Sequence, residues 1–169
     1  EIDFKNKLWA IPSSRMKAGK QHLIPLNDRA VKILKGATHF SGTDVIFPGV
    51  RLGTLSDATL GKTIKTLHTN DLTAGGTGFV DNDVGGRVIT CHGFRSTFRD
   101  WAAEQTAFSR EVIEHCLAHQ LKDKAEAAYQ RKTSVPKRVK LMQHWADYCS
   151  KIPVAKTVGL ENVSKIGEK

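Results

Sequence analysis

The chain has 169 residues, of which 26 are Lys or Arg and 17 are Asp or Glu, so its formal net charge is +9. A hydrophobic fraction of 40% is typical of globular proteins and excludes a disordered chain. Three cysteines are too few for a disulfide framework, and no apolar run approaches the roughly 20 residues that cross a bilayer. We expect one cytoplasmic domain, without membrane contact, whose basic surface favours a polyanionic partner.

The first 26 residues predict a three-stranded antiparallel meander. Short apolar or alternating runs at Ile2–Phe4, Leu8–Ile11 and His22–Leu26 are typical of strands. Polar turns at residues 5–7 and 13–20 separate them, and the second turn is a basic hairpin loop. Because the chain opens inside a strand-like run without a cap or turn, we expect the natural polypeptide to begin further upstream.

The period of the apolar residues changes after the meander. Asn27 or Asp28 can cap a helix that ends near Gly36. Ser56 can cap a second helix, because leucine and isoleucine follow it at spacings of four and three residues. Residues 69–90 are rich in glycine and predict a flexible loop.

The second half of the chain reads as helical. The apolar pattern predicts helices at Phe94–Glu104, Ser109–Ala118, Asp123–Arg131 and Pro136–Ser150. We therefore predict a mainly α domain with a small antiparallel β-meander at its N-terminus (the α+β class) over residues 1–152, and a flexible tail over residues 153–169. The last helix carries an apolar stripe with four members: Val139, Met142, Ala146 and Cys149.

Four sequence features suit the cleavage of a phosphodiester: His92–Arg95, Leu117–His119, Ala128–Arg131 and Lys17. An arginine can bind two oxygens of the charged transition state, and histidines add hydrogen bonds and proton transfer near neutral pH. A tyrosine can attack to form a covalent phosphotyrosine, and a lysine can protonate the leaving oxygen. We expect no cofactor and no metal, since the sequence offers no acidic cluster to hold one.

The spacing of these residues supports a common site. His92 and Arg95 are three residues apart, so both can point from one face at the start of a helix. His119 follows Arg95 by 24 residues, which is room for a helix, a turn and a second helix that returns to the same end. Tyr129 follows after ten more, enough for a short loop and a helical turn.

The runs His92–Arg95, Leu117–His119 and Ala127–Tyr129 closely resemble the signature of the tyrosine recombinases, the phage-integrase family. Residues 15–26 resemble the family's β-hairpin, whose loop carries an active-site lysine. Residues 141–148 resemble the C-terminal helix of integrases from satellite phages and genomic islands. The resemblance covers roughly residues 1–150 and implies the DNA breaking-rejoining catalytic fold of a site-specific recombinase that integrates or excises a prophage or mobile element.

Carried over by position, the resemblance assigns Tyr129 as the nucleophile and Arg95 as a clamp on the scissile phosphate. His92 and His119 become phosphate and proton-transfer partners, and Lys17 becomes the general acid for the 5′-oxygen. The family uses two arginines, and the first lies upstream of the strand where this chain begins. We therefore expect a truncated catalytic domain that is poorly active alone.

The resemblance also implies a double-stranded DNA partner with attachment sites, and a homotetramer on that DNA. For this chain alone it implies a monomer or weak oligomer. Contacts to backbone phosphates give affinity that falls steeply with salt. The basic candidates for such contacts are Arg15, Lys20, Arg99, Arg131 and Lys132. Lys20 is also the second candidate for the general acid.

Several alternatives remain open. Taken alone, a tyrosine such as Tyr129 is more often a half-buried helix residue than a nucleophile, although Tyr148, the other tyrosine, suits the amphipathic last helix better. His115 and His119 have the spacing of zinc ligands on a helix, but no Cys-x-x-Cys pair accompanies them. Two rival functions are a catalytically inactive DNA-binding module of the same fold and a type IB topoisomerase-like enzyme. The last helix is compatible with packing on its own subunit, which we favour for a fragment, or on a neighbour.

Overall fold

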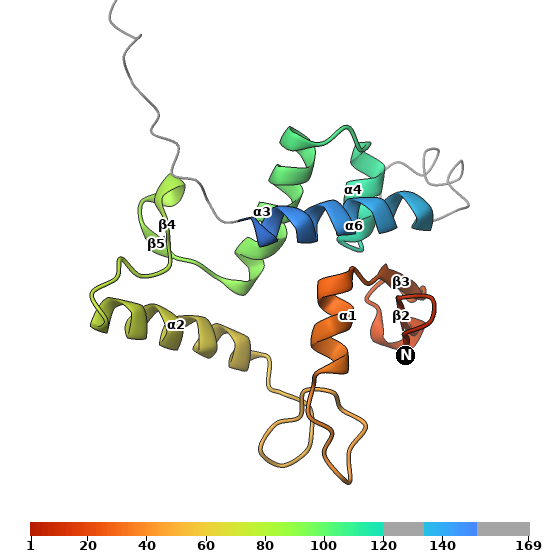
Figure 1. The fold of residues 1–169 in the computed structure, drawn as a ribbon, viewed down its shortest axis with the longest axis horizontal. Coiled ribbons are helices and arrows are strands. Elements are labelled where there is room, and N and C mark those ends of the chain that lie inside the picture. Colours follow the sequence, from red (N-terminus) through yellow and green to blue (C-terminus); the bar gives the residue numbers. More distant parts are fainter. Residues whose placement is uncertain (120–133, 152–169) are drawn as a thin grey trace, which may run out of the picture.

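The computed structural model describes residues 1–119 and 134–151, and Figure 1 shows a mixed α/β arrangement of helices beside a small antiparallel sheet. Within these two ranges, no helix combines the length and the apolar character needed to cross a membrane. The predicted helix at 123–131 and the predicted tail at 153–169 lie outside the described residues.

The N-terminal sheet is the predicted meander. Its strands β1 (Ile2–Asp3), β2 (Leu8–Ile11) and β3 (His22–Pro25) are antiparallel and pair in sequence order. Trp9 of β2 lies opposite residue 2 on one side and residue 24 on the other. The strand β1 is shorter than predicted, because residues 4–7 form a turn that closes at Lys7 with a φ of +52°.

Two helices follow the sheet. Helix α1 (Asp28–Lys35) has the predicted limits, since the Asn27 side chain accepts a hydrogen bond from the backbone N–H of residue 30 and Gly36 lies at the C-cap. Helix α2 (Ala58–Thr73) begins one residue later than a Ser56 cap requires. That prediction is wrong: Asp57 holds the N-cap position, and the Ser56 hydroxyl pairs with the hydroxyl of Thr59 instead.

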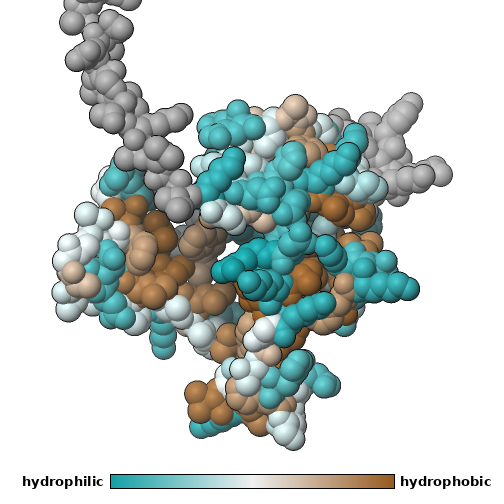
Figure 2. All heavy atoms as spheres, in the orientation of Figure 1, coloured by the Kyte–Doolittle hydropathy of each residue, from teal (hydrophilic) through white to brown (hydrophobic). Residues whose placement is uncertain are grey.

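The prediction of a flexible loop at residues 69–90 is also wrong. Helix α2 extends into this segment, and β4 (Val80–Asp81) and β5 (Arg87–Val88) then form an antiparallel hairpin. The two strands are connected by a 3-10 turn at Asn82–Val84 followed by Gly85 and Gly86, whose φ values of +74° and +73° are rarely adopted by residues with a Cβ. Exposed leucine, phenylalanine and valine side chains gather over α2 and this hairpin (Figure 2).

The remaining helices are α3 (Cys91–Gln105), α4 (Arg110–Cys116) and α6 (Val135–Ser150). Helix α3 begins three residues earlier than predicted, because the hydroxyl of Thr90 caps it by accepting the N–H of Gly93 at 3.1 Å. Helix α4 starts after Ser109 as predicted and ends at Cys116, where the backbone turns out of the helix.

The core lies where α6 crosses α3 and α4 (Figure 1). The indole of Trp145 packs against the rings of Trp101 and Phe98, with centroid separations of 4.9 and 5.5 Å. Helix α6 therefore packs on α3 and α4 of the same chain. The buried cluster consists of Phe98, Trp101, Ala102, Val112, Ile113, Leu117 and Leu141.

The predicted apolar stripe on α6 is only partly correct. Ala146 is buried, but Val139 is 46% exposed and Cys149 is also exposed. The face that meets the core runs instead through Arg138 and Leu141, which are 1% and 0% exposed. The apolar stripe predicted from the sequence misses this face, because the first residue of the face is the charged Arg138.

Candidate active site

Helix α3 carries the first two candidate residues at its N-terminal end. Capping by Thr90 starts the helix at Cys91, so His92 lies in the first turn and Arg95 follows one turn later. Both residues are exposed. A spacing of three residues places them on the same side of the helix, as predicted.

Arg95 joins α3 to the end of α4. Its Nη2 donates a hydrogen bond to the backbone oxygen of Leu117 at 2.5 Å and lies 3.1 Å from Nε2 of His119. A guanidinium carries five N–H groups in a planar fork, so this exposed side chain has further donors directed away from those two partners. The predicted proximity of Arg95 and His119 is therefore present in the structure.

His119 is held from its other side by Glu114. Nδ1 of His119 lies 2.5 Å from one carboxylate oxygen of Glu114, and Nε of Arg99 donates to the other at 2.8 Å. Burial raises the pKa of Glu114, but hydrogen bonds from His119 and Arg99 outweigh this effect and hold its pKa below the usual value. Glu114 is thus an ionised carboxylate only 8% exposed.

Glu114 is not among the residues that the sequence predicts for this site. Glutamate is rarely buried unless it is paired, so its position directly after the apolar Val112 and Ile113 does not by itself mark Glu114 as a buried residue. The structure shows that the pairing partners are the candidates Arg99 and His119.

The end of α4 places His119 beside that carboxylate. The N–H of His119 donates to the backbone oxygen of Glu114 at 3.0 Å, and the N–H of Ala118 donates to the oxygen of His115 at 3.2 Å. These two hydrogen bonds define the Schellman motif at the end of a helix. In this motif the first residue after the C-cap has the left-handed backbone conformation. Ala118 fills that position with a φ of +55°.

Replacing Ala118 with glycine is expected to stabilise the protein. A Cβ in the left-handed region costs about 1–2 kcal/mol, and the extra freedom of glycine in the unfolded chain offsets about 0.4–1 kcal/mol of the gain. We expect the free energy of unfolding to rise by about 0.5–1 kcal/mol in urea titrations followed by circular dichroism. The matched control is Ala103→Gly in the last turn of α3, an exposed helical position where glycine should destabilise the protein by about 0.5–1 kcal/mol. Equal losses from both changes would contradict this account.

The other candidate residues are not joined to this pair. Lys17 and Lys20 are exposed in the β2–β3 hairpin, and within the described ranges neither forms a hydrogen bond or ion pair with Arg95 or His119. Arg15 pairs with Glu1 at 2.5 Å. The predicted nucleophile and two predicted DNA contacts lie outside the described residues: Tyr129, Arg131 and Lys132.

Two histidines and a cysteine lie near the buried Arg138: His22, His115 and Cys116. Nη1 of Arg138 donates to the backbone oxygen of Leu23 at 2.6 Å. Burial, followed by the charge of Arg138, lowers the pKa of His22 and of His115. Burial raises the pKa of the Cys116 thiol to about 11, so it stays protonated and unreactive. Among residues 1–119 and 134–151, no three His, Cys, Asp or Glu side chains converge as metal ligands do.

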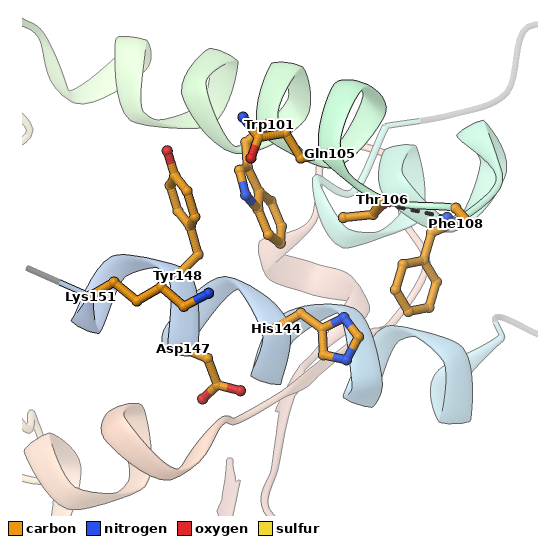
Figure 3. Close-up of a pocket in the computed structure, with 9 residues that line it drawn as sticks. Trp101, Gln105, Thr106, Phe108, His144, Asp147, Tyr148 and Lys151 are labelled. Atoms are coloured by element: carbon orange, nitrogen blue, oxygen red, sulfur yellow. Dashed lines mark hydrogen bonds between the residues drawn. The ribbon is translucent and has the colours of Figure 1, made fainter. Parts of the chain in front are cut away.

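A pocket of about 620 Å³ opens between the C-terminal end of α3 and α6 (Figure 3), away from the Arg95–His119 pair. Tyr148 lies on its wall, with its ring 5.3 Å from that of Trp101 and 5.6 Å from that of Trp145. The structure therefore gives Tyr148 the packing role that the amphipathic pattern predicts.

Comparison with known proteins gives a consistent result. Residues 1–134 match the model of the phage integrase family. The prophage integrase IntA of Escherichia coli K12 is 33% identical over 98% of this chain and 37% of its own length. The integrase of enterobacteria phage P4 is 29% identical over 88% of this chain and 34% of its own length. The chain thus spans about a third of the relatives it matches, and no solved structure matches it.

Proposed function

The chain belongs to the phage integrase family, and from this premise we propose that it carries the catalytic domain of a site-specific DNA recombinase. In this proposal the domain has the tyrosine-recombinase fold. The enzyme cuts and rejoins DNA through a covalent 3′-phosphotyrosine, and so integrates or excises a prophage or mobile element.

The observation that carries the proposal is the pairing of Arg95 with His119. Their side chains come from α3 and from the residues just after α4, yet Nη2 and Nε2 are 3.1 Å apart. An exposed guanidinium beside an imidazole is suited to the negative charge that develops on the equatorial oxygens of a phosphate under attack. His92 lies one turn before Arg95 and adds a third donor on the same side of α3.

The proposed reaction is a transesterification, in which one DNA phosphate exchanges its 5′-oxygen for the oxygen of a tyrosine. The phenolic oxygen of Tyr129 forms a bond to phosphorus and gives up its proton to one of the site histidines, His92 or His119, and the bond from phosphorus to the 5′-oxygen breaks. Lys17 protonates that oxygen as it leaves, which gives a free 5′-hydroxyl. Attack by the 5′-hydroxyl of a partner duplex reverses these steps, so the bond energy is kept and no nucleotide hydrolysis is needed.

Double-stranded DNA is the proposed partner, and a homotetramer on two sites is the proposed assembly. The net charge of +9 favours a polyanion. Arg15 and Arg99 are more than a third exposed at their side chains although each pairs with a carboxylate, so both remain candidates for phosphate contacts.

The test is covalent trapping on a nicked suicide substrate that carries the attachment site, using the intact protein that contains this chain. The wild-type protein should form a protein–DNA adduct that survives denaturation, and Tyr129→Phe should abolish it. Tyr148→Phe is the matched control and should trap DNA at the wild-type level. An adduct from the Tyr129→Phe variant would show that another residue is the nucleophile.

The same assay separates the rival functions. Salt-dependent DNA binding without any adduct from the wild-type protein would indicate an inactive DNA-binding module. Relaxation of supercoiled DNA that lacks an attachment site would indicate a topoisomerase.

A further inference from the structure

We propose that Glu114 is a positioning residue for the reaction, which fixes the imidazole of His119 so that Nε2 faces Arg95 and the phosphate held there. This inference rests on the proposed function. Glu114 itself touches neither DNA nor the reacting atoms in this proposal, since its carboxylate is buried behind His119.

The geometry leaves Glu114 with no freedom to turn away. One carboxylate oxygen lies 2.5 Å from Nδ1 of His119, and the other accepts a hydrogen bond from Nε of Arg99 at 2.8 Å. The backbone oxygen of the same residue accepts the N–H of His119 at 3.0 Å. His119 is therefore attached to Glu114 by both its backbone and its side chain, and these two contacts restrict the orientation of its ring.

The ionised carboxylate also determines which ring nitrogen carries the proton. A carboxylate can only accept hydrogen bonds, so Nδ1 of His119 must be the donor. In the neutral imidazole the lone pair then lies on Nε2, where Nη2 of Arg95 can donate to it at 3.1 Å. When the ring gains a proton, Nε2–H points the same way and can donate to a phosphate oxygen while Glu114 still holds Nδ1–H.

Arg99 supports the ionised form of the carboxylate, together with the hydrogen bond from His119. Its guanidinium is a permanent cation, and its pairing with Glu114 contributes to the lowered pKa of that carboxyl. The arrangement runs in order from Arg99 through Glu114 and His119 to Arg95, and it links two turns of α3 to the end of α4. The backbone oxygen of Glu114 is enough to end α4. The separate contact of its carboxylate with the ring of His119 therefore points to a second role for this side chain.

The first test is the protonation state of His119 in the chain without DNA. In ¹⁵N-histidine spectra, with the His119 signals assigned by their loss in His119→Gln, the neutral ring should be protonated at Nδ1. In Glu114→Gln the amide can donate to Nδ1, so a population protonated at Nε2 should appear. A wild-type ring protonated at Nε2, or an unchanged ring in the Glu114→Gln variant, would overturn the proposal. The wild-type spectrum decides the question even where the variant fails to fold.

The second test separates DNA binding from chemistry in the trapping assay. Loss of a partner that orients a reacting group costs about 10–100-fold, so Glu114→Gln should slow adduct formation by that factor while the DNA dissociation constant changes less than about twofold. Glu104→Gln, an exposed change on α3, should alter neither. An unchanged rate in the Glu114→Gln variant would refute the positioning role. A wild-type protein that forms no adduct would refute the proposed function instead, and the spectra would still test Glu114.

Discussion

Replacement of Arg95 by lysine is expected to slow adduct formation by at least about 100-fold, which is the usual effect of losing one transition-state donor. Lysine keeps the charge, but its ammonium is a point charge on a flexible stem. It cannot donate to Leu117 and face His119 while also binding two phosphate oxygens, as the fork of Arg95 can. The measurement is the rate of covalent trapping at saturating DNA.

The structure also provides the control for this change. Arg51 is an exposed arginine in the connection between α1 and α2, so Arg51→Lys should trap DNA at the wild-type rate. Arg95→Lys should in addition lower the free energy of unfolding by about 1 kcal/mol, because the hydrogen bond to Leu117 is lost. An Arg95→Lys variant that traps DNA within about threefold of the wild-type rate, well short of the loss expected for a transition-state donor, would contradict the role assigned to Arg95.

Truncation of Leu141 to alanine is expected to lower the free energy of unfolding by about 2–5 kcal/mol. Leu141 is 0% exposed at the point where α6 meets α3 and α4. The loss would be a large part of the roughly 5–15 kcal/mol that stabilises a typical domain. Urea unfolding of the two proteins, followed by tryptophan fluorescence, to which the buried Trp101 contributes, measures the difference.

Val139→Ala is the matched control for this truncation. Val139 lies two residues earlier on the same helix but is 46% exposed, so its truncation should change the free energy of unfolding by less than about 0.5 kcal/mol. The two variants also distinguish the apolar stripe predicted from the sequence from the face that the structure buries. Similar losses from both would mean that α6 does not pack as described.

The elements with strong local signals could be predicted from the sequence. The meander, the Asn27 cap and the start of α4 depend on nearby residues, and all three are confirmed. The hairpin at residues 80–88 escaped prediction because its strands have two residues each, too few for an alternating pattern. The buried face of α6 escaped for a different reason: the partner of Arg138 is the backbone of β3, which no local pattern reveals.

The candidate site also has residues that the sequence could predict and residues that it could not. Spacing along helices predicted that His92, Arg95 and His119 share one region, and the structure shows Arg95 beside His119. Glu114 was missed because a glutamate in a helical run reads as a solvated charge unless its burial is known. Lys17 lies on an exposed hairpin loop, and spacing along the chain does not determine where such a loop points.

The contacts of α6 with the N-terminal segment have a consequence for how the chain is made. Arg138 binds Leu23, Asn27 binds Met142, and Asp28 binds Gln143, and each of these three hydrogen bonds joins residues 115 positions apart. At synthesis rates of about 5–20 residues per second, roughly 6–23 seconds separate the two halves of each contact. During that interval β3 is an edge strand without its helix. A nascent chain therefore presents its sheet edge to chaperones and to other nascent chains until α6 has been made and has emerged from the ribosome.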